Sequence, residues 1–139
     1  MNARCSQRWF DLGSEALPRE LGTFGPRDFD LLPFGTFTVD REGTVLDWEP
    51  GGSSRRISLS ADELRGRSFF RQVAPCFFVA DFQKIVHPLF GRNSFDETFF
   101  FTFRFPGEWR QARMRMRDDR NGRIEISVIS TSRIGSEAA

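Results

Sequence analysis

The sequence predicts an α+β domain with a five-stranded antiparallel sheet that is covered on one face by helices. Two strand patterns come first, helical segments follow, and three longer strand patterns end the chain. This grouping favours helices that are segregated to one side of an antiparallel sheet. The length of 139 residues suits one domain with its own core. Hydrophobic residues at 39% and charged residues at 28% are typical of a globular protein.

The N-terminal segment, residues 1–30, is interpreted as an irregular arm or cap because glycines and prolines interrupt it repeatedly. A short helix around residues 28–32 fits the pattern. Residues 31–134 hold the regular elements and form the predicted domain. Residues 135–139 are expected to be a flexible tail.

The first regular pattern is a hairpin. Phe34 to Val39 is rich in aromatic and β-branched residues and predicts a strand. A turn over residues 40–43 follows, and Thr44 to Trp48 is expected to return as the second strand.

The helical segments come next. Ser60 is a candidate N-cap with Glu63 three residues later, and Arg67 to Val73 forms another short segment. The longest predicted helix spans Ala80 to Phe90, where apolar residues recur at spacings of three and four. Pro88 is expected to strain its end.

Three strands are predicted in the last third, over residues 95–105, 110–117 and 123–131. The pair Asn121-Gly122 indicates a tight turn between the last two. Alternation places four aromatic rings on one face of the first of these strands; they are Phe99, Phe101, Phe103 and Phe105. These rings are expected either to form ordinary core or to line an apolar ligand pocket.

The segment from Gly66 to Cys76, which ends in Val-Ala-Pro-Cys, resembles the photoactive yellow protein family. In that family the last cysteine carries p-coumaric acid as a thioester. The element order also resembles that of PAS domains, and the similarity runs from about Leu31 to Ile129. The resemblance implies a PAS fold with an N-terminal cap, and a sensory function in signal transduction. It implies a small aromatic or acyl ligand near Cys76, with a p-coumaric acid thioester as the candidate cofactor for light sensing.

The chain departs from the family at the far end of the chromophore. The family's tyrosine position falls on Trp48, and the chain contains no tyrosine. The family's glutamic acid position falls on Gly52 or Ser53, and its arginine could be replaced only by Arg55 or Arg56. A buried phenol without such partners stays protonated. Unless Arg55, Arg56 or Trp48 reaches it, we therefore expect a p-coumaroyl group here to be a neutral phenol that absorbs further to the blue, or to be absent.

Cys76 has three interpretations: a buried structural thiol, an attachment site that needs a lowered pKa, or an exposed redox sensor. The family resemblance selects a set of residues around it as walls of a candidate ligand site. The set is Cys76, Trp48, Phe69, Val73, Ala74, Phe77, Phe103 and Phe105.

Other functions are disfavoured by the sequence. Formal net charge is +1, which gives no reason to expect a nucleic-acid partner. No segment resembles a membrane span or a signal peptide, so a cytoplasmic location is expected. Cys5, Cys76 and His87 do not form a zinc pattern, and no catalytic motif is present, so an enzyme is not expected.

The expected partner is an unidentified signalling protein or a second copy of the chain. Alternating arginines at positions 113, 115 and 117 are expected to be a solvated sheet face or a docking site for an acidic partner. The alternative function is a chromophore-free PAS module for protein interaction or dimerisation.

Overall fold

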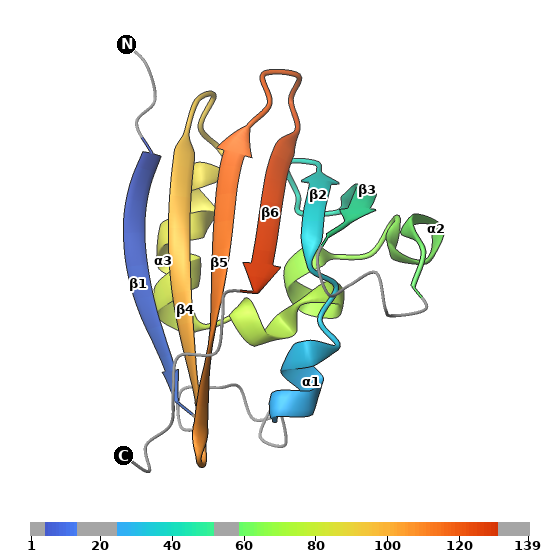
Figure 1. The fold of residues 1–139 in the computed structure, drawn as a ribbon. Coiled ribbons are helices and arrows are strands. Elements are labelled where there is room, and N and C mark those ends of the chain that lie inside the picture. The colour runs from blue at the N-terminus through green and yellow to red at the C-terminus, as the bar shows by residue number, and fades with distance from the viewer. Residues whose placement is uncertain (1–4, 14–24, 52–58, 131–139) are drawn as a thin grey trace.

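The computed structural model describes residues 5–13, 25–51 and 59–130, and it holds one sheet with helices packed on one face (Figure 1). The sheet order is β1-β4-β5-β6-β2-β3. The strands are β1 (Cys5–Gly13), β2 (Gly35–Val39), β3 (Val45–Pro50), β4 (Asp96–Phe105), β5 (Glu108–Asp118) and β6 (Ile124–Ser130). The helices are α1 (Pro26–Asp30), α2 (Ala61–Leu64), the π-helix η4 (Phe69–Val73), the 3₁₀-helix η5 (Pro75–Phe77) and α3 (Ala80–Leu89).

The predicted fold class is confirmed, and one strand is added to it. The five predicted strands pair antiparallel in the order β4-β5-β6-β2-β3. The sixth strand, β1, comes from the segment interpreted as irregular and pairs parallel with β4. The expectation of a purely antiparallel five-stranded sheet was therefore wrong at this edge.

Specific side-chain contacts hold β1 in place. The Phe10 ring packs on Phe82, Phe99 and Phe101, with centroid distances of 5.4, 6.0 and 5.3 Å. On the opposite face Trp9 stacks on Phe100 at 4.6 Å. Aromatic pairs of this kind stabilise packing beyond the area that they bury, so they favour β1 despite its weak sequence pattern.

The core lies between the inner face of the sheet and the helices. Alternation along β4 buries Phe99, Phe101 and Phe103 completely and leaves Phe105 6% exposed, as predicted. The inner face of β5 adds Ala112, Met114 and Met116, all fully buried. The helix α3 closes this layer with Phe82, Val86 and Leu89.

Backbone conformations at two places depend on particular residues. The β5–β6 turn contains the predicted Asn121-Gly122 pair, but its positive φ angles are at Arg120 and Gly122. At the start of β2, Gly35 has a φ of +132°, and a Cβ there would lie 2.2 Å from the Glu49 carbonyl oxygen. Only glycine fits this close approach of β2 to β3.

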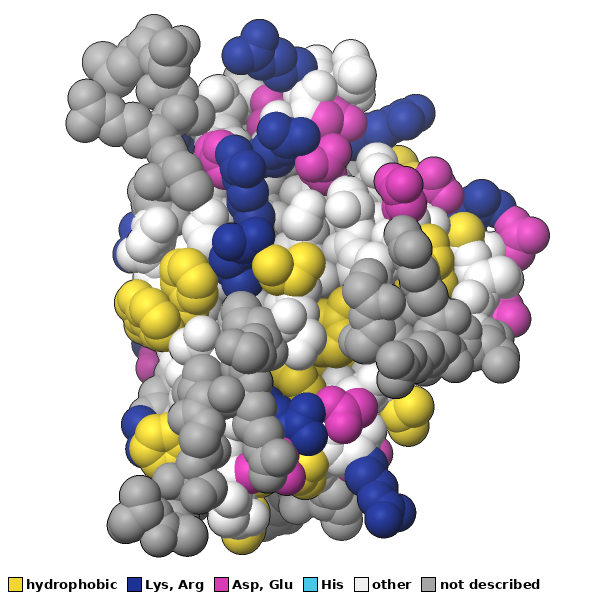
Figure 2. All heavy atoms as spheres, in the orientation of Figure 1, with side chains coloured by type: hydrophobic (Ala, Val, Ile, Leu, Met, Phe, Trp, Pro, Cys, Tyr) yellow, Lys and Arg dark blue, Asp and Glu magenta, His cyan; other side chains and the backbone are white. Residues whose placement is uncertain are grey.

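The outer face of the sheet has no helix over it among the described residues (Figure 1). Figure 2 shows this face, where Lys and Arg side chains mix with acidic and hydrophobic ones. The predicted arginine alternation is confirmed: Arg115 pairs with Asp96, and Arg117 pairs with Glu125. The stripe is therefore partly neutralised by neighbouring carboxylates, as expected of a solvated sheet face.

Candidate functional site

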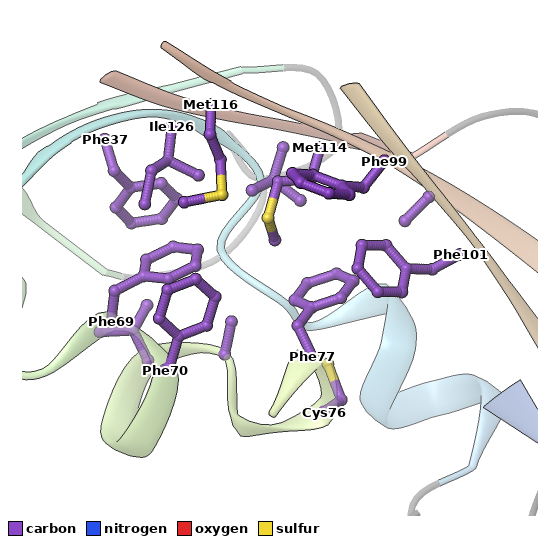
Figure 3. Close-up of a cluster of buried hydrophobic side chains, with 14 of the residues drawn as sticks. Phe37, Phe69, Phe70, Cys76, Phe77, Phe99, Phe101, Met114, Met116 and Ile126 are labelled. Atoms are coloured by element: carbon purple, nitrogen blue, oxygen red, sulfur yellow. The ribbon is translucent and has the colours of Figure 1, made fainter. Parts of the chain in front are cut away.

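Two short helices in series carry Cys76 into the core (Figure 3). In η4 the amide of Ala74 donates to the Phe69 carbonyl at 2.8 Å, an i→i−5 bond that widens the turn. Pro75 then begins η5, where its fixed φ suits a first helical position. The Phe77 amide donates to the Ala74 carbonyl at 3.1 Å and closes the turn around Cys76.

The thiol of Cys76 is fully buried and in its neutral form. Its residue exposure is 0%. Burial raises the pKa of the thiol far above its ordinary value, and hydrogen bonds from the backbone amides of Cys76 and Phe77 offset only part of that effect. A redox sensor needs an accessible thiolate, so this environment does not fit that interpretation.

The predicted aromatic walls lie toward two ends of one connected set of buried rings. Phe77 contacts the β4 rings, with centroids 4.6 Å from Phe101 and 5.8 Å from Phe103. Phe103 in turn stacks on Phe105 at 6.2 Å. Figure 3 shows Phe69 on the other side of the core, beside Phe37 and Phe70.

Trp48 lies at the Phe69 end of this core, in contact with Phe37. Trp48 is 3% exposed and stacks on Phe37, with ring centroids 6.0 Å apart. Phe37 meets the edge of Phe69 at 4.9 Å. Val73 and Ala74, which connect Phe69 to Cys76 along the chain, are buried at 8% and 4% exposure. The candidate residues thus line one continuous core, which they share with the interior face of the sheet.

The single polar atom of the Trp48 side chain already has a partner. Its indole Nε1 donates to the Phe34 carbonyl oxygen at 3.2 Å. Indole nitrogen has one N–H and no acceptor capacity, so it has no second bond to offer a phenolate. Gly52, Ser53, Arg55 and Arg56 lie outside the described residues.

The described residues therefore supply an attachment atom at one end and no free donor from Trp48 at the other. The thiol supplies an attachment atom inside an apolar, aromatic environment. At the position of the family's tyrosine, the Trp48 N–H is engaged by backbone. A neutral aromatic group suits such surroundings, and an anionic one does not.

The structure also contains a surface groove that sequence reasoning missed. We call it the hairpin groove; it has a volume of about 550 Å³ and lies between the β2–β3 turn, η4 and α3. Cys76 does not line it. Its residues are Arg41, Glu42, Gly43, Ser68, Phe70, Arg71, Phe78, Gln83, Val86, His87, Phe90 and Gly91.

Arg41 builds one wall of this groove. Its guanidinium donates to the carbonyl oxygens of Phe90 and Arg92, at 3.4 and 2.6 Å, and to Asp118 Oδ1 at 2.8 Å. The Asp118 side chain is only 4% exposed. Arg41 thus fixes the β2–β3 turn to the end of α3 and to β5, and these long-range bonds leave no local signal in the sequence.

His87 lies in the last turn of α3 and lines the groove. In the described ranges, no three His, Cys, Asp or Glu side chains gather as metal ligands would. None of the described helices has the length and apolar character of a membrane span.

Comparison with known proteins finds similarity to photoactive yellow proteins. No protein-family model matches the chain. The chain is 36% identical over 53 residues to photoactive yellow protein of Cereibacter sphaeroides; the match covers 37% of this chain and 40% of that protein. The matched segment is therefore less than half the length of the curated relative.

A solved structure extends the likeness to most of the fold. The photoactive yellow protein domain of the sensor histidine kinase Ppr from Rhodospirillum centenum superposes with a TM-score of 0.55 and 27% identity. The match covers 78% of this chain and 96% of that domain.

Proposed function

We propose that this chain, a photoactive yellow protein-like PAS domain, is a non-enzymatic sensory module that holds a small aromatic or acyl group at Cys76. One observation carries the proposal. The segment that resembles the family's attachment motif places its cysteine inside the core, against the aromatic rings of η5 and β4. A group bound there would be shielded from water and would alter the packing between the helices and the sheet.

The candidate cofactor is p-coumaric acid held as a thioester, and it would supply absorption of light. Cys76 would hold its acyl end, while Phe77 and the β4 rings would exclude water from it. At the phenol end, the Trp48 N–H remains with the Phe34 carbonyl. The proposal is therefore a protonated chromophore that absorbs further to the blue than a phenolate.

Reconstitution with an activated p-coumaroyl ester tests this function. Acyl transfer forms a bond between the Cys76 sulfur and the acyl carbon, and the ester's leaving group departs with the thiol proton. A Cys5→Ser background restricts the reaction to one thiol. We expect a mass gain of one p-coumaroyl group and no absorption band to the red of the free thioester. Cys76→Ser is the control, and an unchanged mass of the Cys76 protein would contradict the proposal.

A second variant tests the phenol end separately. Trp48→Tyr would restore a hydroxyl at the family's tyrosine position and would release the Phe34 carbonyl from its indole partner. In the reconstituted protein we expect a shift of the absorption band to the red and a lower pKa of the phenol. An identical spectrum in both proteins would show that this position does not contact the chromophore.

The second candidate function is a chromophore-free PAS module for protein interaction or dimerisation. Complete burial of the Cys76 thiol and its raised pKa favour it, because both slow acylation. Absence of a mass gain together with concentration-dependent association in sedimentation would select this function.

In either case the proposed output is a signalling partner or a second copy of the chain. The route would be motion of η4, η5 or the N-terminal segment, because these adjoin Cys76 or pack on the same core. A cytoplasmic location and the absence of nucleic-acid binding stay predictions.

A further inference from the structure

The hairpin groove has the size and the composition of a small-molecule site. Its volume of about 550 Å³ lies within the range of 300–1,000 Å³ that is typical of ligand pockets. Three separate parts of the chain form it, and Arg41 fixes one wall through bonds to Phe90, Arg92 and Asp118. The groove is therefore a preformed feature of the fold.

The floor of the groove is apolar. Phe70 and Val86 are 8% and 2% exposed, and the Phe70 and Phe90 rings lie 6.3 Å apart. At the rim Phe78 is 36% exposed. Such a floor favours a ligand with a flat hydrocarbon body, because its contact removes apolar surface from water.

One polar group in the groove has no partner. Gln83 Nε2 is buried and makes no hydrogen bond among the described residues. A buried amide donor without an acceptor costs about 1–3 kcal/mol. Gln83 lines the groove, so rotation of its amide toward a ligand oxygen there would remove that cost, and the groove favours a ligand with a hydrogen-bond acceptor.

A positive charge at the rim favours a ligand whose hydrogen-bond acceptor is negatively charged. The Arg71 guanidinium lies 5.5 Å from the centroid of the Phe78 ring, and Arg71 forms no ion pair in the described part of the chain. Arg41, in contrast, is engaged with Asp118. Glu42 on the facing turn disfavours a second negative charge. These groups together favour a single carboxylate.

We propose that the hairpin groove binds a small aromatic or flat apolar monocarboxylate, whose carboxylate accepts a hydrogen bond from Gln83 and is attracted by Arg71. This site is separate from the interior around Cys76 and does not depend on the proposed function.

Titration with benzoate, followed by amide and side-chain NMR shifts of the full chain, tests the proposal. We expect saturable shifts at Gln83, Phe70 and Val86, which persist in Cys76→Ser. Arg71→Met and Gln83→Leu should each raise the dissociation constant at least five-fold. Arg113→Met, an exposed arginine on the outer sheet face, is the matched control and should leave the constant unchanged.

Two further readouts exclude a general loss of structure. Gln83→Leu removes the unpaired amide and should raise the thermal midpoint of the free protein while it weakens benzoate binding. Benzyl alcohol, which keeps the ring and lacks the carboxylate, should bind at least five-fold more weakly than benzoate. The proposal is overturned if benzoate shifts only residues beside Cys76, if it causes no saturable shifts, or if benzyl alcohol binds equally well.

Discussion

The interior around Cys76 and the hairpin groove are two candidate ligand sites of opposite character. The first is fully buried, and its surroundings are aromatic rings with a neutral thiol. The second is open, with an apolar floor, an unpaired amide and a cationic rim. The chemistry for covalent attachment lies in one region, while the accessible space and the unsatisfied polar group lie in the other.

The two regions share the helix η4. Phe69 packs on Phe37 in the core, whereas Phe70 and Arg71 line the groove. A single helical turn therefore carries side chains that face the buried core and side chains that face the open groove. The difference teaches that resemblance to an attachment motif locates a thiol, while the ability to admit a ligand depends on the packing around it.

The largest expected loss of stability comes from a cavity in the interior beside Cys76. Phe77→Ala removes a fully buried ring that contacts Phe101 and Phe103, and should destabilise the protein by about 3–5 kcal/mol. It should also speed labelling of Cys76 by a thiol reagent in the Cys5→Ser background. Urea unfolding and labelling rates measure both effects. Phe78→Ala, at a 36% exposed neighbouring position, is the control and should cost less than about 1 kcal/mol.

Arg41→Ala tests whether the wall of the groove is held by its ion pair. The change leaves the buried Asp118 carboxylate without its arginine and should cost about 2–3 kcal/mol. Arg92→Ala is the matched control, because Arg92 contributes its backbone carbonyl to Arg41, and that carbonyl remains. Equal stability of the two variants in urea would show that the ion pair does not support the turn.

Burial of the Cys76 thiol also predicts that the free energy of unfolding depends on pH. The pKa of Cys76 is raised in the folded protein, so the unfolded thiol loses its proton first as pH rises. Stability is therefore fully present below about pH 8.5 and falls above it, by about 2 kcal/mol at pH 10. Unfolding of Cys5→Ser should show this loss, and the Cys5→Ser, Cys76→Ala double variant should lack it. Parallel pH curves would mean that the folded thiol is accessible to water.

The smallest effect is expected at Trp48, at the end of the interior remote from the thiol. Trp48→Phe keeps an aromatic ring against Phe37 and removes the bond to the Phe34 carbonyl. We expect a loss of about 1–2 kcal/mol in urea unfolding, with no change in labelling of Cys76. Faster labelling would mean that the packing around Trp48 controls access to the Cys76 thiol.

The parts of the fold that sequence predicted are those with strong local periodicity. The helix predicted over Ala80 to Phe90 spans Ala80–Leu89, and the alternation along β4 buries the predicted rings. Ser60 is the N-cap residue of α2, but its side chain makes no cap bond; its carbonyl accepts the Glu63 amide at 3.2 Å. The sequence therefore predicted the N-cap position at Ser60, but not that its backbone carbonyl, rather than its hydroxyl, makes the bond.

The parts that sequence missed depend on distant contacts. β1 forms because Phe10 reaches Phe82 and the β4 rings, which lie far along the chain. The groove exists because Arg41 bonds to residues 49 to 77 positions away. At the candidate site, the motif predicted the place of Cys76, but only packing shows that Phe69 packs on Phe37 while Phe77 packs on the β4 rings.

The parallel pairing of β1 with β4 has a consequence for the order in which the chain is made. Arg8 of β1 pairs with Glu97, 89 residues later. At translation rates of roughly 5–20 residues per second, β1 leaves the ribosome roughly 5–20 s before its partner strand. During that interval Trp9 and Phe10 have no sheet to join. We therefore expect β1 to dock last during folding, and to be the element most readily exchanged between two copies at high concentration.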